Sequence, residues 1–424
     1  MYVSDNAPTN AKSNKEKYMS NFINLHSEIG KLNTVMLHKP GVEVEMLIPD
    51  YLEHMLFEDT PYVPEARREH DVFAGILRDR GVNVLYLEDL FTESVKDAAV
   101  RKKFIEDYLV LANVQAETLK SVLREYLLPL SPKELFYEVC KGVRRKDIKI
   151  AGDKKPLPVM VEESYPFYTD PVPSLYFTRD ISICIGNGMI VSSMSMPFRK
   201  REALFMRYIH DYHKDFAGAP VWYDYTLGYS VEGGDILVLS DKVLAVGYGQ
   251  RTSLGAIENF AMKLLTEGGY EKILVFNLPK DRLHMHLDVL CTMVDYDKFL
   301  TAPQVRNGEF DVYELTLDSH GNLRAENHKD SLDKVFSRAL GLPAVQFIQT
   351  GGGDPQLSSR EHWNMGSNSL AIAPGEIITY GRNEVTNELL TKAGIKVHTI
   401  PGGELSRGRG GPRCMSMPIN RDRI

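Results

Sequence analysis

The feature that most constrains the fold is a weak internal repeat, in which an acidic residue is followed by a short apolar strand, a turn and a second strand. Two copies begin at Asp180 and Asp235, and the shape returns at Asn368 and, less cleanly, at Asp288. The copies at Asp235 and Asn368 are followed by a helical run and a third strand, and a fifth unit fits the segment that starts at Thr34. Repeats that mix strands with a helix favour a radial or stacked assembly.

We therefore predict an α/β fold in which five strand-helix units surround a centre. A doubly wound sheet is the competing fold, but the strand-turn-strand hairpins argue against pure alternation of strands and helices. In the radial arrangement the leading polar residue of each unit points at one shared site, where a packed core would need apolar side chains. These residues are Asp180, Asp235, Asp288 and Asn368.

One segment differs from the repeats. From about residue 90 to residue 147 the chain is rich in Leu, Lys, Glu and Val and contains a single glycine, Gly142. Its apolar residues recur at helical spacing, for example at positions 110–111, 114, 119 and 122–123. We predict a small helical bundle at residues 91–159, inserted into a larger domain that is formed by residues 1–90 and 160–424.

Charge and hydropathy argue against several kinds of partner. The net charge is −7 and basic residues occur only in short clusters, whereas nucleic-acid binding needs a clustered positive surface. The first twenty residues are polar and carry no apolar stretch, which argues against a secretory signal. No run approaches the roughly 18 apolar residues of a membrane helix. We expect no nucleic-acid or membrane partner, and the sequence leaves the oligomeric state open, a homo-oligomer included.

The cysteines indicate a reducing compartment. Four cysteines lie far apart, with no C-x-x-C pair for zinc and no dense disulfide framework: Cys140, Cys184, Cys291 and Cys414. Cys184 and Cys291 stand in apolar, strand-like runs and are expected to be inert core residues. A cytoplasmic location fits this pattern best.

Cys414 has a different setting from the other cysteines. It stands ten residues from the C-terminus, and glycines and arginines dominate the stretch between Gly402 and Arg413. Glycine allows the backbone to approach a ligand closely. Arginines nearby stabilise a thiolate, which is the nucleophilic form of cysteine. A flexible basic tail is the alternative. As part of a site, the glycine-rich stretch is expected to move as a lid.

The segment His284-Met-His286-Leu-Asp288 has three interpretations. Alternate residues of a strand share one face, so the three polar side chains could converge on a metal. They could also be structural residues at a strand edge. In the third interpretation His286 is a general acid and base with Asp288 beside it, and a carboxylate such as Glu232 orients the imidazole and raises its pKa.

Two facing carboxylates, Asp180 and Asp288, match a guanidinium ligand. A guanidinium is planar and permanently charged, and carboxylates accept its N–H groups in bidentate pairs. A cysteine thiolate could attack the central carbon, and His286 could protonate the departing ammonia and then activate water. Candidates for binding a carboxylate at the other end of such a substrate, or else ordinary surface residues, are Arg199, Arg251 and Arg409.

Five motifs in this order make the chain similar to the arginine deiminases of the bacterial type. They are Phe177-Thr-Arg-Asp180, Glu232-Gly-Gly-Asp235, Met285-His-Leu-Asp288, Gly351-Gly-Gly-Asp-Pro355 and the ending Arg409-Gly-Gly-Pro-Arg-Cys-Met-Ser-Met-Pro418. The resemblance runs from about Leu32 to the C-terminus and includes the helical insertion. It implies a five-bladed αβ propeller, the pentein fold, and hydrolysis of L-arginine to L-citrulline and ammonia without a cofactor or metal.

The resemblance also implies roles for particular residues. Cys414 corresponds to the nucleophile, His286 to the acid and base, and Glu232 to the carboxylate that orients the histidine. Asp180 and Asp288 correspond to the guanidinium clamp.

At the other end of the substrate, Arg199 and Arg251 correspond to the pair that binds the α-carboxylate, and Arg409 lies on the loop that borders the site. One position departs from the family pattern. Ser174 stands three residues before Phe177, where the family often has asparagine, so one contact to the amino-acid end of the substrate is in question. Serine can still donate and accept a hydrogen bond.

Three alternatives stay open at this stage. The first is another guanidine-modifying enzyme of the same fold, namely an amidinotransferase, an agmatine deiminase or a dimethylarginine hydrolase. The helical insertion and the three candidate arginines favour free arginine, because agmatine lacks a carboxylate. The second is a non-catalytic binding propeller, which would not need Cys414. The third is a metallohydrolase that uses His284, His286 and Asp288.

Overall fold

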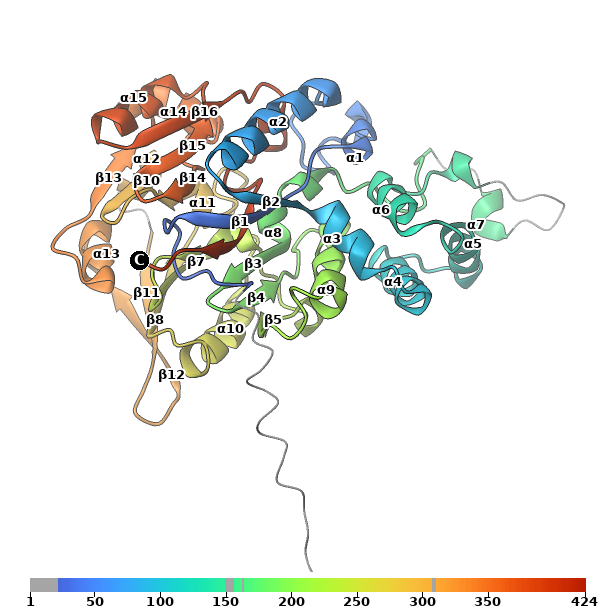
Figure 1. Cartoon of the computed structure of the whole chain (residues 1–424), viewed down its shortest axis with the longest axis horizontal. Helices are drawn as coiled ribbons and strands as arrows, with labels where there is room; N and C mark the ends of the chain where they lie inside the picture. The colour runs from blue at the N-terminus through green and yellow to red at the C-terminus, as the bar shows by residue number, and fades with distance from the viewer. Residues whose placement is uncertain (1–21, 149–155, 162–163, 307–309) are drawn as a thin grey trace, which may run out of the picture.

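The computed structural model describes residues 22–148, 156–161, 164–306 and 310–424 (Figure 1). The polar N-terminal segment discussed above and residues 149–155 of the predicted insertion lie outside the described residues. Within the described residues, none of the helices combines the length and the apolarity needed to cross a bilayer.

Four of the sheets share one pattern, in which an antiparallel hairpin is joined by a parallel third strand. The four sets are β3 (Ser182–Ile185), β4 (Gly188–Val191) and β5 (Val221–Tyr223); β6 (Ile236–Val238), β7 (Val243–Tyr248) and β8 (Lys272–Asn277); β9 (Cys291–Met293), β10 (Lys298–Thr301) and β13 (Gln346–Gln349); and β14 (Leu370–Ala373), β15 (Glu376–Tyr380) and β16 (Lys396–Ile400).

A helix separates the hairpin from the third strand in each set, which makes the parallel return feasible. These helices are α9 (Glu202–Tyr212), α10 (Leu254–Thr266), α13 (Leu332–Leu340) and α15 (Glu384–Lys392). The helical runs and third strands predicted after the second and fourth hairpins are confirmed. The third unit is longer than predicted, because α12 (Pro303–Arg306) and the hairpin of β11 (Val312–Leu317) and β12 (Leu323–His328) precede α13, and this hairpin extends the sheet of β8.

The fifth sheet joins the two ends of the described chain. Strand β1 (Leu32–Leu37) pairs in parallel with β2 (Asn83–Tyr86), and α2 (Val63–Asp79) lies between them in sequence, as predicted for the unit near Thr34. The antiparallel partner of β1 is β17 (Met417–Arg421), so this C-terminal strand completes the unit near Thr34 (Figure 1). Sequence reasoning did not predict this strand.

A leading polar residue stands just before the first strand of each sheet. Asp180 lies in the single turn α8 (Thr178–Ile181), Asp235 in the 3₁₀ turn η7 (Gly233–Asp235) and Asp288 in the turn α11 (Leu287–Leu290). Asn368 and Cys414 hold the same place before β14 and β17. All five are at most 4% exposed. Cys414 is therefore the leading residue of the fifth sheet.

The segment predicted as a helical bundle consists of helices. In order these are α3 (Leu87–Ser94), α4 (Ala98–Leu111), α5 (Glu117–Leu127), α6 (Pro132–Lys141) and α7 (Leu157–Met160), and α4 to α7 lie to one side of the sheets (Figure 1). Asp97 caps α4 by accepting from the backbone N–H groups of residues 99 and 100. Ser131 and Glu134 form a capping box at α6. The division into domains at residues 91 and 159 stays a prediction.

Two of the cysteines behave as predicted. Cys184 and Cys291 are buried in β3 and β9, and burial raises the pKa of each thiol to about 12. Both thiols are thereby held neutral.

Aromatic rings join the helical segment to the sheets. Phe91 in α3 contacts Phe104, Phe136 and Phe205, with ring centroids 4.7, 5.7 and 5.0 Å away. Phe205 belongs to α9, so this cluster couples the insertion to the unit that carries Asp180.

We predict that Phe91→Ala lowers the free energy of unfolding by about 3–5 kcal/mol, because it opens a cavity at the centre of this cluster. Chemical denaturation measures the loss. The control is Val110→Ala on α4. The side chain of Val110 is 68% exposed, so this substitution should change the stability little. Equal effects of the two substitutions would contradict the prediction.

Candidate active site

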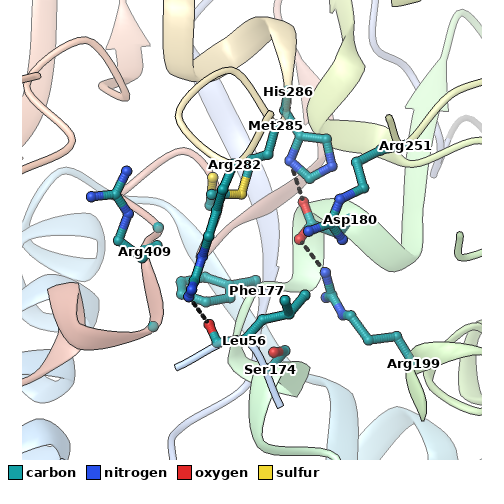
Figure 2. A pocket seen from close by; sticks show the side chains of 13 residues that line it. Leu56, Ser174, Phe177, Asp180, Arg199, Arg251, Arg282, Met285, His286 and Arg409 are labelled. Atoms are coloured by element: carbon teal, nitrogen blue, oxygen red, sulfur yellow. Dashed lines mark hydrogen bonds and ion pairs between the residues drawn. The ribbon is translucent and has the colours of Figure 1, made fainter. Parts of the chain in front are cut away.

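One pocket collects most of the residues that the sequence singled out (Figure 2). Seven of the nine predicted site residues line it: Ser174, Asp180, Arg199, Arg251, His286, Arg409 and Cys414. The other two, Glu232 and Asp288, do not line the pocket but contact residues that do. Of the four leading residues named from the sequence, Asp180 lines the pocket, and Asp288 and Asn368 contact Cys414, which also lines it.

Glu232 and His286 form a buried charged pair. Glu232 Oε2 lies 2.8 Å from Nε2 of His286, and Glu232 Oε1 accepts from the backbone N–H of Ser195 at 3.0 Å and from its hydroxyl at 3.1 Å. Burial opposes the ionised carboxylate, but the charge of Arg251 and the hydrogen bond to His286 outweigh it, so the pKa of Glu232 lies well below its usual range. Glu232 is an anion although it is fully buried.

His286 carries the complementary charge. Burial alone would lower the pKa of its imidazole, but the charge of Asp180 and the hydrogen bond to Glu232 raise that pKa to about 9. The backbone next to it is fixed by Asp235, which accepts from the N–H of Leu287 at 3.0 Å and from the hydroxyl of Thr252 at 2.6 Å. His286 is thus an oriented imidazolium at neutral pH.

Cys414 is held by its backbone. Its N–H donates to Oδ1 of Asn368 at 3.0 Å, and its carbonyl accepts from the N–H of Arg179 at 3.1 Å. The sulfur lies 3.5 Å from Oδ2 of Asp288. Burial and the charges of Asp288 and Asp180 raise the pKa of the thiol well above its usual value, and only Arg413 among the arginines of the tail opposes them. The expectation that these arginines stabilise a thiolate is therefore wrong for the protein without substrate.

Arg199 is occupied by acidic residues. It precedes α9, and its Nε and Nη2 donate to Glu202 at 2.8–3.1 Å, while Nη1 donates to Oδ2 of Asp180 at 3.0 Å. Figure 2 shows Asp180 between His286 and Arg199. Sequence reasoning missed Glu202, although its position three residues after Arg199 is a signal that could have found it.

Arg251 and Arg409 keep unused donors. Nη1 of Arg251 lies 3.7 Å from Oε2 of Glu232, and its buried Nε has no hydrogen-bond partner. Arg409 lies with its guanidinium carbon 3.5 Å from the ring centre of Trp363 and donates to the carbonyl of that residue at 3.1 Å. Its Nε and Nη2 are buried without partners. Burial lowers the pKa of Arg409 to about 10.

A fourth arginine, Arg282, also lines the pocket and was not predicted. It donates to the carbonyl of Leu56 at 2.8 Å and pairs with Glu58 at 2.9 Å (Figure 2). The sequence carries no signal for this contact, because Leu56 and Arg282 are far apart in the chain.

Among the described residues, one group of three could offer ligand atoms to a metal within 4.8 Å of one another: Asp180, Glu232 and His286. Arg199 and Arg251 lie within 4 Å of Glu232 in this group, and their positive charges disfavour a cation there. The strand expected at residues 284–288 is wrong, since the turn α11 begins at Leu287. His284 bonds to Asp281 at 2.8 Å and does not line the pocket, so the triad that the metallohydrolase alternative requires does not form.

The glycine-rich loop is tightly packed. Glu69 of α2 accepts from the backbone N–H groups of Gly403, Glu404 and Leu405 at 2.7–3.2 Å. A methyl group on Gly408 would stand 2.2 Å from the hydroxyl of Tyr176, and one on Gly410 would stand 2.1 Å from the ring of Phe177. These glycines are required for close contact. Movement of the loop as a lid stays a prediction.

The high pKa of His286 links protonation to stability. The pKa is about 9 in the folded protein and about 6.5 for an unperturbed histidine, so the folded state binds this proton more tightly. Its contribution is complete below about pH 6.5 and is lost as the pH rises to about 9.

We predict that the unfolding free energy of the protein falls between these two pH values, and that it falls less in His286→Asn. Denaturant titrations at both pH values measure this difference. Equal losses in the two proteins would show that His286 is not held as an imidazolium.

Comparisons with known proteins agree with this geometry. The sequence model of the arginine deiminase family matches residues 53–421. The arginine deiminase of Bacillus cereus (strain B4264) is 45% identical over 411 residues, which cover 96% of this chain and 100% of that protein. The arginine deiminase of Limosilactobacillus fermentum is also 45% identical, over 95% of this chain and 100% of its own length.

Solved structures share the fold at low sequence identity. An amidinotransferase of saxitoxin biosynthesis from Microseira wollei has a TM-score of 0.54 at 16% identity, over 95% of this chain and 98% of its own. The N-terminal domain of a cyanobacterial arginine dihydrolase has a TM-score of 0.52 at 15% identity, over 92% and 97%. A dimethylarginine dimethylaminohydrolase has a TM-score of 0.51 at 12% identity, over 91% and 99%. The α/β architecture of several small sheets is shared with these three structures, and the near full-length match in sequence places this chain in the arginine deiminase family.

Proposed function

We propose that this protein hydrolyses L-arginine to L-citrulline and ammonia, with Cys414 as the nucleophile. The observation that carries the proposal is the meeting of a thiol, an imidazolium and a carboxylate at one pocket, namely Cys414, His286 and Asp180, with a second carboxylate, Asp288, in contact with the thiol. The near full-length match to arginine deiminases supports the same substrate.

Asp180 and Asp288 are proposed to hold the guanidinium. Oδ1 of each carboxylate is buried and has no hydrogen-bond partner, whereas Oδ2 of each already accepts from an arginine. A buried carboxylate oxygen without a donor is costly. Two such oxygens close to one thiol match the N–H groups of a planar cation.

The thiolate is proposed to form when the substrate binds. Burial and the charges of Asp288 and Asp180 hold the thiol neutral without substrate. A guanidinium between the carboxylates cancels part of their field, which lowers the pKa of the thiol. The thiol proton is then released to solvent, because His286 is already protonated.

The reaction then proceeds in two steps. The thiolate attacks the guanidinium carbon, the C–N bond breaks, and His286 gives its proton to the departing ammonia. The product of this step is an S-alkylthiouronium on Cys414. In the second step neutral His286 takes a proton from water, the hydroxide adds to the same carbon, and the C–S bond breaks to release citrulline.

Glu232 supports both steps through its hydrogen bond to His286. It orients the ring and stabilises the imidazolium, and Arg251 and Arg199 keep Glu232 ionised. Asp235 holds the adjacent backbone.

The substrate's α-carboxylate is proposed to bind Arg251 and Arg409, which have free donors. All three side-chain nitrogens of Arg199 already donate to Glu202 or Asp180 in this state. A guanidinium that bonds to Asp180 would compete with Arg199, and the released Nη1 could then turn to the substrate's other end. Ser174 lines the same pocket and is proposed to contact that end.

We also propose that the five sheets are the blades of a five-bladed αβ propeller formed by residues 1–90 and 160–424, with residues 91–159 inserted. The support is that each sheet places one leading residue in the buried layer around the site. A cytoplasmic location, the absence of nucleic-acid and membrane partners, and the oligomeric state stay predictions or open questions.

An amidinotransferase is the second candidate within the fold, because a solved amidinotransferase shares it. A transferase passes the amidino group to an amine, whereas a deiminase passes it to water. Release of ammonia with citrulline, in the absence of any added amine, separates the two.

We predict that Cys414→Ala forms no detectable citrulline from arginine, because Cys414 is the only thiol that lines the pocket among the described residues. A colorimetric citrulline assay on purified protein measures this, and Cys291→Ala, which removes a buried thiol of β9, should keep the activity. Full activity in Cys414→Ala would refute the covalent mechanism.

We predict that Arg251→Ala raises KM for arginine by about tenfold or more, because a hydrogen bond to a charged group contributes about 1.5–3 kcal/mol. Agmatine has no carboxylate and should be affected much less. Steady-state kinetics with both substrates measure the ratio. Equal losses for the two would remove the carboxylate-binding role and leave only the contact of Arg251 with Glu232.

A further inference from the structure

Arg413 lies beneath the site and does not line the pocket. It is 1% exposed, and its donors reach three partners. Nη1 donates to Oδ2 of Asp288 at 2.8 Å, Nε and Nη2 donate to the two oxygens of Glu28 at 3.1 and 3.0 Å, and Nη2 also donates to the carbonyl of Ile236 at 2.7 Å. The residue that precedes the nucleophile therefore bridges a clamp carboxylate to a distant glutamate.

Glu28 belongs to the segment before β1, far from the catalytic motifs in sequence. It is 6% exposed and also accepts from the backbone N–H of Val238 in β6 at 3.1 Å. Burial opposes its charge, but Arg413 and Arg179 outweigh burial and lower the pKa of Glu28 to about 2. Glu28, Arg413 and Asp288 thus form a buried row of alternating charges.

We propose that Arg413 and Glu28 are positioning residues, which fix the orientation of Asp288 and set the charge beside the thiol of Cys414. This inference rests on the proposed function in assigning Asp288 to the substrate. The geometry supports it, because Oδ2 of Asp288 is shared by Arg413 and the thiol, and Oδ1 is left buried without a partner. Arg413 therefore selects which oxygen remains for a guanidinium.

Glu28 offsets the positive charge of Arg413 in this arrangement. Arg413 alone would cancel the charge of Asp288 and weaken its attraction for a cation. The carboxylate of Glu28 occupies two donors of Arg413 and offsets its charge, so the row keeps a net negative charge. The same carboxylate satisfies Arg413, which would otherwise be a costly buried cation.

Several charged or titratable groups face the thiol from the elements packed around it. They are Asp288 of α11, Asp180 and Arg179 of α8, His286 before α11, Tyr176 of the 3₁₀ turn η4 (Pro173–Tyr176), Tyr380 of β15 and Arg413 itself. Removing the charge of Glu28 should lower the thiol pKa and removing the charge of Arg413 should raise it, while the other groups stay in place.

The test measures the rate at which iodoacetamide alkylates Cys414 as a function of pH in the full-length protein without substrate. Glu28→Gln removes a negative charge, so the apparent thiol pKa should fall, and alkylation at a fixed pH below it should be about tenfold faster. Arg413→Gln removes a positive charge, so the pKa should rise and alkylation should slow by a similar factor. Peptide mass spectrometry assigns the label, and Cys414→Ala gives the background.

Arginine kinetics give a second readout. In Glu28→Gln the KM for arginine should rise with kcat reduced less, because the clamp loses attraction but keeps its orientation. In Arg413→Gln kcat should fall strongly, because Asp288 is no longer fixed and the thiol is harder to ionise.

Glu361→Gln is the matched control. Glu361 is also a buried glutamate that accepts backbone N–H groups, those of Val385 and Thr386 at 2.9 Å, in α14 (Pro355–Trp363) and away from Cys414. It should lower the melting temperature and leave the alkylation profile unchanged.

Opposite shifts in the two variants would support the proposal, and shifts in the same direction, or none, would overturn it. Gln has nearly the shape of Glu and keeps an acceptor, so Glu28→Gln alone decides the question if Arg413→Gln does not fold. The alkylation result does not depend on catalysis. A wild-type protein that forms no citrulline would therefore refute the proposed function without deciding this inference.

Discussion

The hydrogen bond between Glu232 and His286 is the interaction on which the rest of the site depends. Both groups are buried, and burial alone would make each of them neutral. Arg251 and Arg199, 3.7 and 3.9 Å from Glu232, keep the carboxylate charged, and Asp180 together with this carboxylate keeps His286 protonated. A neutral His286 could not supply a proton to departing ammonia. The arginines therefore matter to the chemistry even before any of them contacts a substrate.

The repeat pattern predicted more of this site than the catalytic motifs taken singly. An acid or amide before a strand, in several similar units, indicated that Asp180, Asp235, Asp288 and Asn368 approach a common centre, and all four are buried beside or within the site. Cys414 obeys the same rule, since it precedes β17. The place of Cys414 before a strand of the fifth sheet could not be recognised from the sequence, because this sheet is built from both ends of the described chain. Pairing between β1 and β17 has no local signature, whereas a hairpin has one in its turn.

The sequence did not predict the contacts that determine which donor and acceptor atoms of a side chain are left without a partner. Asp180 and Arg199 were both predicted to lie at the site, but their direct contact at 3.0 Å was not predicted, and neither was the pairing of Arg199 with Glu202. The thiol pKa was misjudged for the same reason. Arginines near Cys414 in sequence suggested a positive environment, yet the nearest charged oxygens in space belong to Asp288 and Asp180. Proximity in sequence is a poor guide to the electric field at a buried atom.

In the glycine-rich loop, two glycines are needed for close packing and not for the flexibility that was expected. Flexibility was the expected reason for Gly408 and Gly410, but each leaves room for an aromatic ring, and neither has a positive φ. The residue between them, Arg409, has a φ of +65° and two buried donors without partners. Strain and unmet hydrogen bonds thus concentrate on one arginine in a loop whose neighbours are closely packed. Any closure over a substrate should therefore consist mainly of Arg409 leaving Trp363, since movement of the whole loop would have to break its bonds to Glu69.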